Sequence, residues 1–274
     1  MESAHNFEVS DLFSVKGKTI LVTGGSSGLG LQMAAGFLQN GARVIIASRK
    51  QANCDTALDS LSNLGEAYAV AADVASADGR ARIVEFVTEK FGKLDVLVNN
   101  AGTNYAAQIE DYSDEAFEKV INTNVSAVFS LTRDLTPLLC KAGTTESTAR
   151  VINIGSMDGI HVPVVQRIPT FAYSASKASL HHLTKTLAIH LASRHIVVNA
   201  VAPGFFASKM TDYVFDHYLE DIEADCPLKR VGQPNEIVGI AIYLASAAGA
   251  YTNGTVIPVD GGCSISKGYR EWLD

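Results

Sequence analysis

Tyr173 and Lys177 have the side-chain types and the spacing that proton transfer needs, because they stand four positions apart in Tyr173-Ser174-Ala175-Ser176-Lys177. In a helix, positions i and i+4 share one face, so the two side chains would lie together. A phenol titrates near pH 10, and an ammonium group beside it favours the ionised form. The pair therefore predicts an acid–base site on a helix.

A glycine-rich segment, Thr23-Gly24-Gly25-Ser26-Ser27-Gly28-Leu29-Gly30, directly follows the apolar residues 19–22. Glycines at this spacing permit a tight turn, close approach of a pyrophosphate, and close packing of a helix on a sheet. The N-terminus of the next helix offers N–H donors and positive partial charge to phosphates. We expect cofactor contacts from Gly24, Ser26, Ser27, Gly28, Leu29 and Gly30. With the Tyr–Lys pair, this segment predicts a nicotinamide-dependent oxidoreductase.

The end of the next apolar segment predicts the choice of cofactor. An acidic residue there would bind the ribose hydroxyls of NAD, whereas this chain has Ser48 followed by Arg49 and Lys50. Arg49 offers a planar fork of donors to a 2′-phosphate, and Ser48 offers a neutral hydroxyl. We therefore expect NADP(H), the alternative being that Arg49 and Lys50 are solvated loop charges.

Composition excludes several classes of protein. The 274 residues are 47% hydrophobic and carry a net charge of -7, which argues against nucleic acid or an anionic membrane as the main partner. No apolar run approaches the roughly 20 residues of a membrane helix, and the N-terminal stretch lacks the apolar centre of a secretory signal. We expect a soluble, cytoplasmic protein.

The cysteines and histidines give no metal or disulfide signal. Cys54, Cys140, Cys226 and Cys263 are far apart in sequence and form no C-x-x-C motif. The pair His181-His182 has no carboxylate or cysteine partner at metal spacing, so packing or solvent contact is expected of it. We expect no metal site and no disulfide framework.

Strand and helix signals alternate along the chain, the pattern of a parallel sheet covered on both faces. Strands are expected at about residues 19–22, 44–47, 68–71, 96–98, 151–154, 197–201 and 256–259. Helices are expected after Gly28, over 80–91, from about 113 to 140, from 173 to about 193, and after Pro234. The fold class is therefore α/β, a single Rossmann-type doubly wound domain with about seven parallel strands.

No composition shift marks a linker, so one domain is expected. We place an N-terminal extension at residues 1–15, the oxidoreductase domain at 16–263 with a substrate lid at about 205–225, and a C-terminal tail at 264–274. The reactive residues fall at the carboxyl ends of the expected strands, where such sheets bind ligands.

Five motifs occur in the order of the short-chain dehydrogenase/reductase family: residues 23–30, Asn99-Asn100-Ala101-Gly102, Ser156, Tyr173 with Lys177, and Pro203-Gly204. The chain resembles this family over roughly residues 16–262. Within the family, residues 151–156, 203–210 and 257–262 look like the 3-oxoacyl-(acyl carrier protein) reductases, including the bacterial reductases named for rhamnolipid synthesis.

The resemblance implies catalytic roles. Tyr173 would protonate the carbonyl oxygen as hydride arrives, with Lys177 and the charged nicotinamide bringing its pKa towards operating pH. Lys177 would also hold the ribose hydroxyls, and Ser156 would hydrogen-bond the substrate oxygen. Asn124 would support a water that links Lys177 to solvent, with Asn122 as its rival.

The resemblance also implies the remaining cofactor contacts. Asp73 and Val74 would meet the adenine, and Asn100, Ala101 and Gly102 would line the ribose and nicotinamide side. Residues 201–204, with Pro203 and Gly204, and Ser208 would hold the carboxamide. Asn99 and Asn100 end a strand, and one of them is expected to tie neighbouring strands together.

One spacing departs from the family. Ser156 lies seventeen residues before Tyr173, a few more than is usual, and the extra length falls in residues 161–170. This segment is expected to bulge near the substrate entrance. Thr170 and Ser174 are therefore alternatives to Ser156, which is favoured because it directly follows a strand.

Substrate choice is expected in this bulge and in residues 205–225, where aromatic residues recur and would form a mostly apolar pocket, or pack in the core: Phe205, Phe206, Met210, Tyr213, Phe215 and Tyr218. The expected activity is NADPH-dependent reduction of a 3-oxoacyl thioester or a hydrophobic ketone. An oxidative alcohol or polyol dehydrogenase and a non-catalytic NADP-sensing protein are the alternatives. The resemblance implies a homotetramer or homodimer acting on a small molecule.

Overall fold

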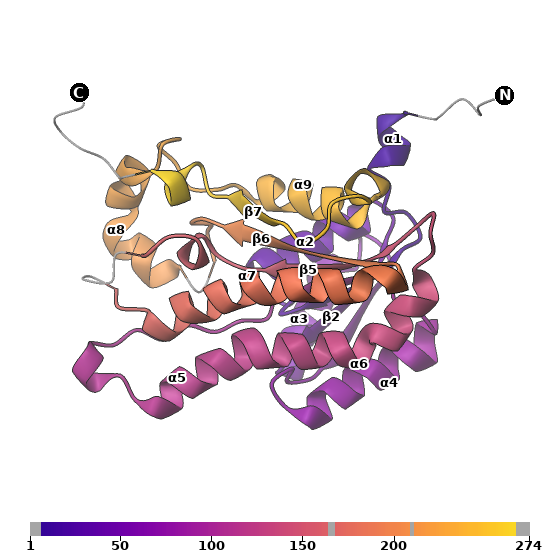
Figure 1. Cartoon of the computed structure of the whole chain (residues 1–274), viewed down its shortest axis with the longest axis horizontal. Coiled ribbons are helices and arrows are strands. Elements are labelled where there is room, and N and C mark those ends of the chain that lie inside the picture. The colour runs from indigo at the N-terminus through magenta and orange to yellow at the C-terminus, as the bar shows by residue number, and fades with distance from the viewer. Residues whose placement is uncertain (1–6, 164–167, 209–210, 267–274) are drawn as a thin grey trace.

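The computed structural model describes residues 7–163, 168–208 and 211–266. Seven parallel strands form one sheet in the order β3-β2-β1-β4-β5-β6-β7 (Figure 1). Their bounds are β1 Thr19–Thr23, β2 Arg43–Ser48, β3 Ala67–Ala71, β4 Val96–Asn99, β5 Ala149–Ile154, β6 Ile196–Pro203 and β7 Val256–Val259. The predicted doubly wound α/β fold is confirmed.

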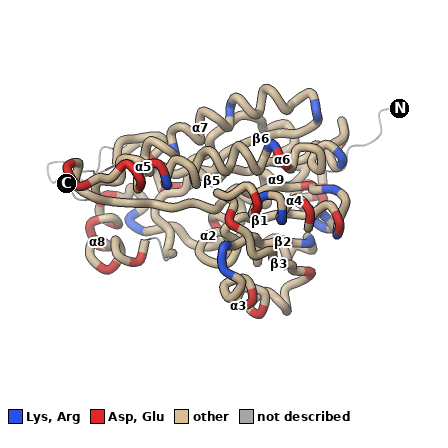
Figure 2. The backbone as a smooth tube through the Cα atoms, turned by 90° about the horizontal axis from the view of Figure 1, so that it is seen from below, with Lys and Arg blue, Asp and Glu red and all other residues tan. Residues whose placement is uncertain are grey.

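Helices cover both faces of the sheet. One face carries α2 (Gly28–Gln39), α3 (Gln51–Leu61) and α9 (Pro234–Ala245), and the other carries α4 (Ala77–Phe91), α6 (Ala127–Ala142) and α7 (Phe171–Leu191). The short α1 (Val9–Leu12) precedes β1. Two further helices, α5 (Asp114–Ile121) and α8 (Asp212–Asp225), lie at the same end of the molecule in Figures 1 and 2.

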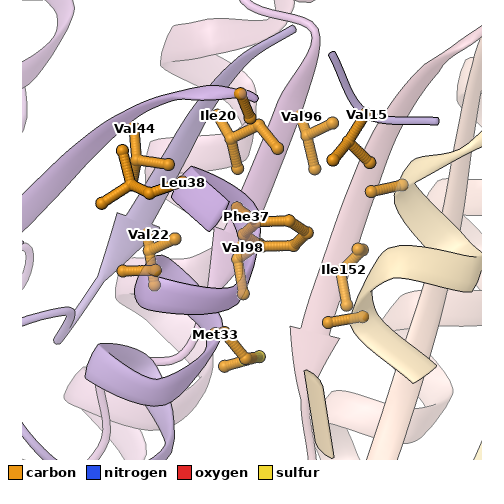
Figure 3. Packing of buried hydrophobic residues seen from close by; sticks show 14 of the residues in the cluster. Val15, Ile20, Val22, Met33, Phe37, Leu38, Val44, Val96, Val98 and Ile152 are labelled. Atoms are coloured by element: carbon orange, nitrogen blue, oxygen red, sulfur yellow. The ribbon is translucent and has the colours of Figure 1, made fainter. Parts of the chain in front are cut away.

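The strands are apolar on both faces because both faces are covered. Ile20 and Val22 point into the layer beneath α2, where they pack near Phe37 (Figure 3), whereas Leu21 between them points into the layer beneath α4 and α6. This alternation produces two separate apolar layers, and it holds the strand ends in a fixed register.

A buried cation lies at the amino end of β5. Arg150 is among the largest fully buried side chains, and its Nη2 donates to the carbonyl oxygen of Ser246 at 3.2 Å. Its Nη1 donates to the carbonyl of Thr148. Burial lowers the pKa of Arg150 to about 10. These bonds tie β5 to the segment that follows α9.

The structure differs from the expected helices in two places. The helix expected from about 113 to 140 is interrupted between α5 and α6 by one wide turn of π-helix, Asn122–Ser126. The helix α3 has no strong sequence signal, because it buries only Cys54, Ala57 and Leu61. Single π-turns often mark functional sites, and this one borders the cavity described below.

The expected domain boundaries stay predictions, and residues beyond Ser266 lie outside the described residues. Among the described helices, none has both the length and the apolar character needed to cross a membrane.

Candidate active site

A cavity of about 580 Å³ opens at the carboxyl ends of the strands, around the point between β1 and β4 where the strand order reverses. This is where open α/β sheets bind ligands. Most of the predicted site residues line it: Gly24, Ser26, Ser27, Gly28, Leu29, Ser48, Arg49, Lys50, Asp73, Val74, Asn100, Ala101, Gly102, Ser156, Tyr173, Lys177, Pro203, Gly204 and Ser208.

The glycine-rich turn has the geometry that the sequence predicts. Gly24 and Gly28 have φ of +64° and +53°, values that favour glycine, and α2 begins at Gly28 with its N-terminus beside the cavity. Gly30 does not line the cavity; a Cβ there would lie 2.4 Å from the carbonyl oxygen of Gly24. Gly30 therefore lets α2 pack closely against the turn, and its expected cofactor contact stays a prediction.

The end of β4 joins this turn to the rest of the site. Asn100 Nδ2 donates to the carbonyl oxygen of Thr23 at 2.9 Å, so the loop after β4 is tied to the glycine-rich turn. Asn99 Nδ2 donates to Asn153 Oδ1 at 2.9 Å, which links β4 to β5. Both residues therefore tie neighbouring strands: Asn99 links β4 to β5, and Asn100, which also lines the cavity, links the end of β4 to the end of β1.

The charges in the cavity suit an anion. Ser26 Oγ donates to Ser48 Oγ at 2.9 Å, so a neutral hydroxyl pair occupies the end of β2. The exposed Arg49 and Lys50 follow, and they form the basic segment directly before α3 in Figure 2. Among the described lining residues Asp73 is the only acidic side chain, against Arg49, Lys50, Lys119 and Lys177.

Ser156, Tyr173 and Lys177 come together at this cavity. Ser156 and Tyr173 both line the cavity, and the Ser156 hydroxyl acts to lower the pKa of Tyr173. Ser156 Oγ also accepts from the N–H of Asp158 at 3.2 Å. Lys177 Nζ donates to the carbonyl oxygen of Ile154 at 2.7 Å and lies 5.4 Å from the centroid of the Tyr173 ring. The end of β5 therefore holds both reactive residues of α7.

The two alternatives to Ser156 lie elsewhere. Neither Thr170 nor Ser174 lines the cavity, and Ser174 Oγ donates to the carbonyl oxygen of Asp158 at 3.0 Å. Part of the expected bulge, residues 164–167, lies outside the described residues. The geometry favours Ser156 as the partner of Tyr173.

Burial dominates the ionisation of the pair. It raises the pKa of Tyr173, the Asp158 carboxylate adds to the rise, and the hydrogen bond from Ser156 opposes it. Burial also lowers the pKa of Lys177 to about 8, with Asp158 opposing. The expected combined effect of Lys177 and the charged nicotinamide on the pKa of Tyr173 stays a prediction.

Asn124 is buried one layer behind the cavity wall. Its Oδ1 accepts from the N–H of Thr103 and its Nδ2 donates to Ser176 Oγ, both at 2.9 Å. A Cβ on Gly102 would lie 3.4 Å from Asn124 Oδ1 and 3.8 Å from Lys177 Nζ, so both side chains lie near this glycine. Its rival Asn122 lines the cavity directly. The proton-relay role of Asn124 stays a prediction.

Sequence reasoning missed several residues of the site. Asn53 and Lys119 line the cavity, but Asn53 lies on the unpredicted α3. Asp158 acts on both Tyr173 and Lys177, and its position two residues after Ser156 was the available signal. Within the described residues no cluster of three or more His, Cys, Asp or Glu side chains could hold a metal ion.

His181 packs beneath the reactive residues, as the sequence suggested, while its neighbour His182 is exposed. The buried His181 ring lies one turn after Lys177. A Cβ on Gly155 would be 2.1 Å from its Nε2, and one on Gly159 would be 2.7 Å from its Cε1. Burial lowers the pKa of His181 to about 4. The neutral imidazole therefore fills the space between α7 and the turn that carries Ser156.

The lid region is partly apolar. Phe206 is buried and lines the cavity, and the rings of Phe205 and Phe215 lie 6.3 Å apart. Tyr213 is 63% exposed, so this aromatic residue does not contribute to a closed pocket here. Met210 lies outside the described residues.

Comparisons with known proteins agree with this geometry. A family model described as "Enoyl-(Acyl carrier protein) reductase" matches residues 24–264. The rhamnolipids biosynthesis 3-oxoacyl-[acyl-carrier-protein] reductase of Pseudomonas aeruginosa is 44% identical over 91% of this chain and 97% of its own length. The reductase FabG of Thermotoga maritima is 36% identical over 92% of this chain and 99% of its own.

Two solved structures have the same fold. The Pseudomonas aeruginosa RhlG/NADP active-site complex superposes with a TM-score of 0.89 at 44% identity, covering 92% of this chain and 98% of that one. An actinorhodin polyketide ketoreductase variant with NADPH gives 0.84 at 32% identity, covering 90% and 97%. The chain therefore belongs to the short-chain dehydrogenase/reductase family of oxidoreductases.

Proposed function

We propose that this protein is an NADPH-dependent reductase that transfers a hydride to a ketone and releases a secondary alcohol. The observation that carries the proposal is that Ser156, Tyr173 and Lys177 line the same cavity at the carboxyl ends of the strands. An acid, a hydroxyl donor and a cation are thereby placed at one point on the cavity wall.

The cavity fits a dinucleotide. Gly24 and Gly28 leave its wall free of side chains, and the N-terminus of α2 faces it. Arg49 and Lys50 would hold a 2′-phosphate beside the neutral Ser48, and Asn53 offers a further donor. NADPH, when bound, supplies the hydride. RhlG and the polyketide ketoreductase, both structural relatives, were solved with NADP and NADPH.

Tyr173 donates the proton in this proposal. Its raised pKa keeps the phenol protonated at neutral pH, which is the form that a reduction consumes. Ser156 would hydrogen-bond the substrate oxygen and orient it towards that proton. Lys177 would hold the ribose, and Asn124, fixed to Thr103 and Ser176, would support the water that returns a proton.

The mouth of the site favours an uncharged, hydrophobic ketone. The lid helix α8 carries acidic residues and no Lys or Arg: Asp212, Asp216, Glu220, Asp221, Glu223 and Asp225. Exposed acids also precede and begin α5, at the same end of the molecule: Glu110, Asp111, Asp114, Glu115 and Glu118. Phosphate groups of a coenzyme or carrier arm would be repelled there. We therefore propose a free ketone over a carrier-bound thioester.

The proposal is tested by initial rates with NADPH and with NADH against acetoacetyl thioesters, aromatic ketones and keto sugars. We expect turnover with NADPH and a loss of at least 1000-fold in Tyr173→Phe, which keeps the ring and lacks the proton. Arg49→Ala should raise the KM for NADPH about 10-fold and leave that for NADH unchanged. Equal effects on both cofactors would refute the 2′-phosphate site.

The same panel decides the direction of the reaction. Gluconate 5-dehydrogenase of Gluconobacter oxydans is a 32% identical relative, so polyols with NADP⁺ belong in it. Faster oxidation of a polyol at neutral pH than reduction of any ketone would overturn the reductase proposal.

We also propose that the protein works in the cytoplasm as a homotetramer or homodimer. Large apolar side chains are exposed on three neighbouring helices: Phe117 on α5, Phe129 on α6 and Ile189 on α7. Exposed apolar side chains of this size often mark an interface with a second chain.

A further inference from the structure

The fold brings two cysteines together that the sequence keeps far apart. Cys226 directly follows the lid helix α8, and Cys263 follows the turn Gly261-Gly262 after β7. Cys226 Sγ donates at 3.8 Å to the carbonyl oxygen of Gly261, two residues before Cys263, and both cysteines line one cavity. The Cys226 thiol also raises the pKa of Cys263. All four cysteines are free, but the fold brings these two to one place.

Backbone packing keeps this pair close. A Cβ on Gly261 would lie 2.8 Å from Cys226 Sγ, so the glycine turn presses directly on that thiol. Gly261 and Gly262 have φ of +64° and +89°, a conformation that other residues seldom adopt. The packing of these two backbone segments therefore keeps the two cysteines close together.

A small molecule can reach the pair. A second cavity, of about 390 Å³, is lined by both cysteines and by Phe205, Ile222, Leu228 and Pro258. Cys226 is buried, whereas Cys263 is only partly covered. The other two cysteines differ: Cys54 is buried with its thiol towards the carbonyl oxygen of Ser48, and Cys140 lies on α6.

We propose that Cys226 and Cys263 form a dithiol–disulfide site, which a small disulfide such as oxidised glutathione closes through this second cavity. The Cys263 thiolate attacks the small disulfide and releases one small thiol, giving a mixed disulfide. Cys226 then displaces the second small thiol, so that two protein thiols are oxidised and one disulfide is reduced to two thiols.

The surroundings set the rate of closure. Burial, and then the neighbouring Cys226, raise the pKa of the Cys263 thiol to about 12. The thiolate is the attacking form, so closure is slow at neutral pH and speeds up as the pH rises. The site therefore responds to sustained oxidation rather than to brief exposure.

Closure ties the end of α8 to the turn after β7. The bond closes a loop from residue 226 to residue 263, which restricts the unfolded chain and anchors one end of the lid. That the disulfide restrains a substrate lid rests on the proposed function. Formation of the disulfide between Cys226 and Cys263 does not.

Oxidised glutathione is added to the folded full-length protein at pH 8.5, and free thiols are then alkylated in denaturant and identified by peptide mass spectrometry. We expect a peptide pair joined through Cys226 and Cys263, with Cys54 and Cys140 alkylated. The double variant Cys54→Ser/Cys140→Ser should close equally. Stable glutathione adducts on the unaltered chain, or all four thiols still free, would overturn the proposal.

Two variants separate the chemistry from folding. Cys263→Ser changes the partly covered residue and should leave Cys226 reduced, whereas Cys226→Ser should trap glutathione on Cys263. The oxidised protein should melt several degrees higher than Cys263→Ser treated in the same way, and dithiothreitol should remove the difference. An equal Tm would refute the tether. Failure to reduce any ketone would refute the proposed function without changing the thiol count.

Discussion

At the scale of single residues, the site buries the ammonium group of Lys177, and burial disfavours its charged form. Lys177 is 5% exposed, and burial lowers its pKa from 10.5 to about 8. A lowered pKa means that the folded state holds the proton less tightly than the unfolded chain does. The charge therefore costs stability below about pH 8, and the cost fades as the pH rises from 8 to 10.5.

Removing this charge should make the protein more stable and inactive. The shift corresponds to about 3 kcal/mol, and loss of the bond to Ile154 offsets part of it. We expect Lys177→Met to gain about 1–2 kcal/mol in the free energy of unfolding at pH 7, measured in urea, and less at pH 10. Lys185→Met, an exposed change on the same helix, is the control. A loss of stability in Lys177→Met, or a gain that grows with pH, would contradict this account.

At the scale of elements, the predictable parts are those whose sequence pattern mirrors their burial. The seven strands are apolar on both faces, so residues such as Leu21 and Val22 identify them directly. The π-turn at Asn122–Ser126 and the weakly apolar α3 carry no such pattern. Tyr173 and Lys177 could be found because their chemistry depends on a local spacing of four residues.

Contacts between segments that are far apart in the sequence could not be predicted from it. The thiol contact of Cys226 with Cys263 depends on where β7 ends relative to α8, and nothing in either local segment encodes it. The influence of Asp158 on Tyr173 and Lys177 depends equally on how the turn after β5 packs on α7. Single-sequence reasoning therefore identified the reactive residues and missed the residues that tune them.

The lid helix α8 should act as an electrostatic filter for substrates. We expect Asp216→Lys/Glu220→Lys to raise kcat/KM for acetoacetyl-coenzyme A about 3- to 10-fold at low salt, because fewer acids then repel its phosphates. The rate with the uncharged N-acetylcysteamine thioester should not change. Steady-state kinetics at 0.02 and 0.5 M salt measure the effect, which should disappear at the higher concentration.

The helix α4, which lies away from α8 (Figure 1), offers a matched control. Glu85→Lys/Glu89→Lys on α4 makes the same change in net charge at the same helical spacing, and both residues are exposed. An equal gain in this control would assign the effect to net charge and refute the filter.

At the scale of the whole molecule, cationic side chains gather in the cofactor cavity, whereas exposed apolar side chains lie on outer helices. The chain has a net charge of -7, yet the cofactor cavity gathers cations, so an anionic cofactor is attracted to one place on an acidic protein. The exposed Phe117, Phe129 and Ile189 lie outside that cavity, on α5, α6 and α7.

Assembly should depend on that apolar surface. Ile189 is 82% exposed on α7, and Ile189→Glu should convert the proposed tetramer or dimer to a smaller species, as measured by light scattering after size exclusion. Val9→Glu changes an equally apolar, exposed residue on α1 and should leave the mass unchanged. A monomeric parent protein, or an unchanged mass in Ile189→Glu, would contradict the proposed interface.

The strand β5 fixes the position of Ser156, and this affects how the substrate specificity of related proteins can change in evolution. Its amino end is fixed by the buried Arg150, and its carboxyl end passes directly into Ser156. Neither anchor involves a residue of α8. A lineage can therefore exchange one substrate for another by changing the mouth, while inheritance of this single strand preserves the position of the reactive hydroxyl.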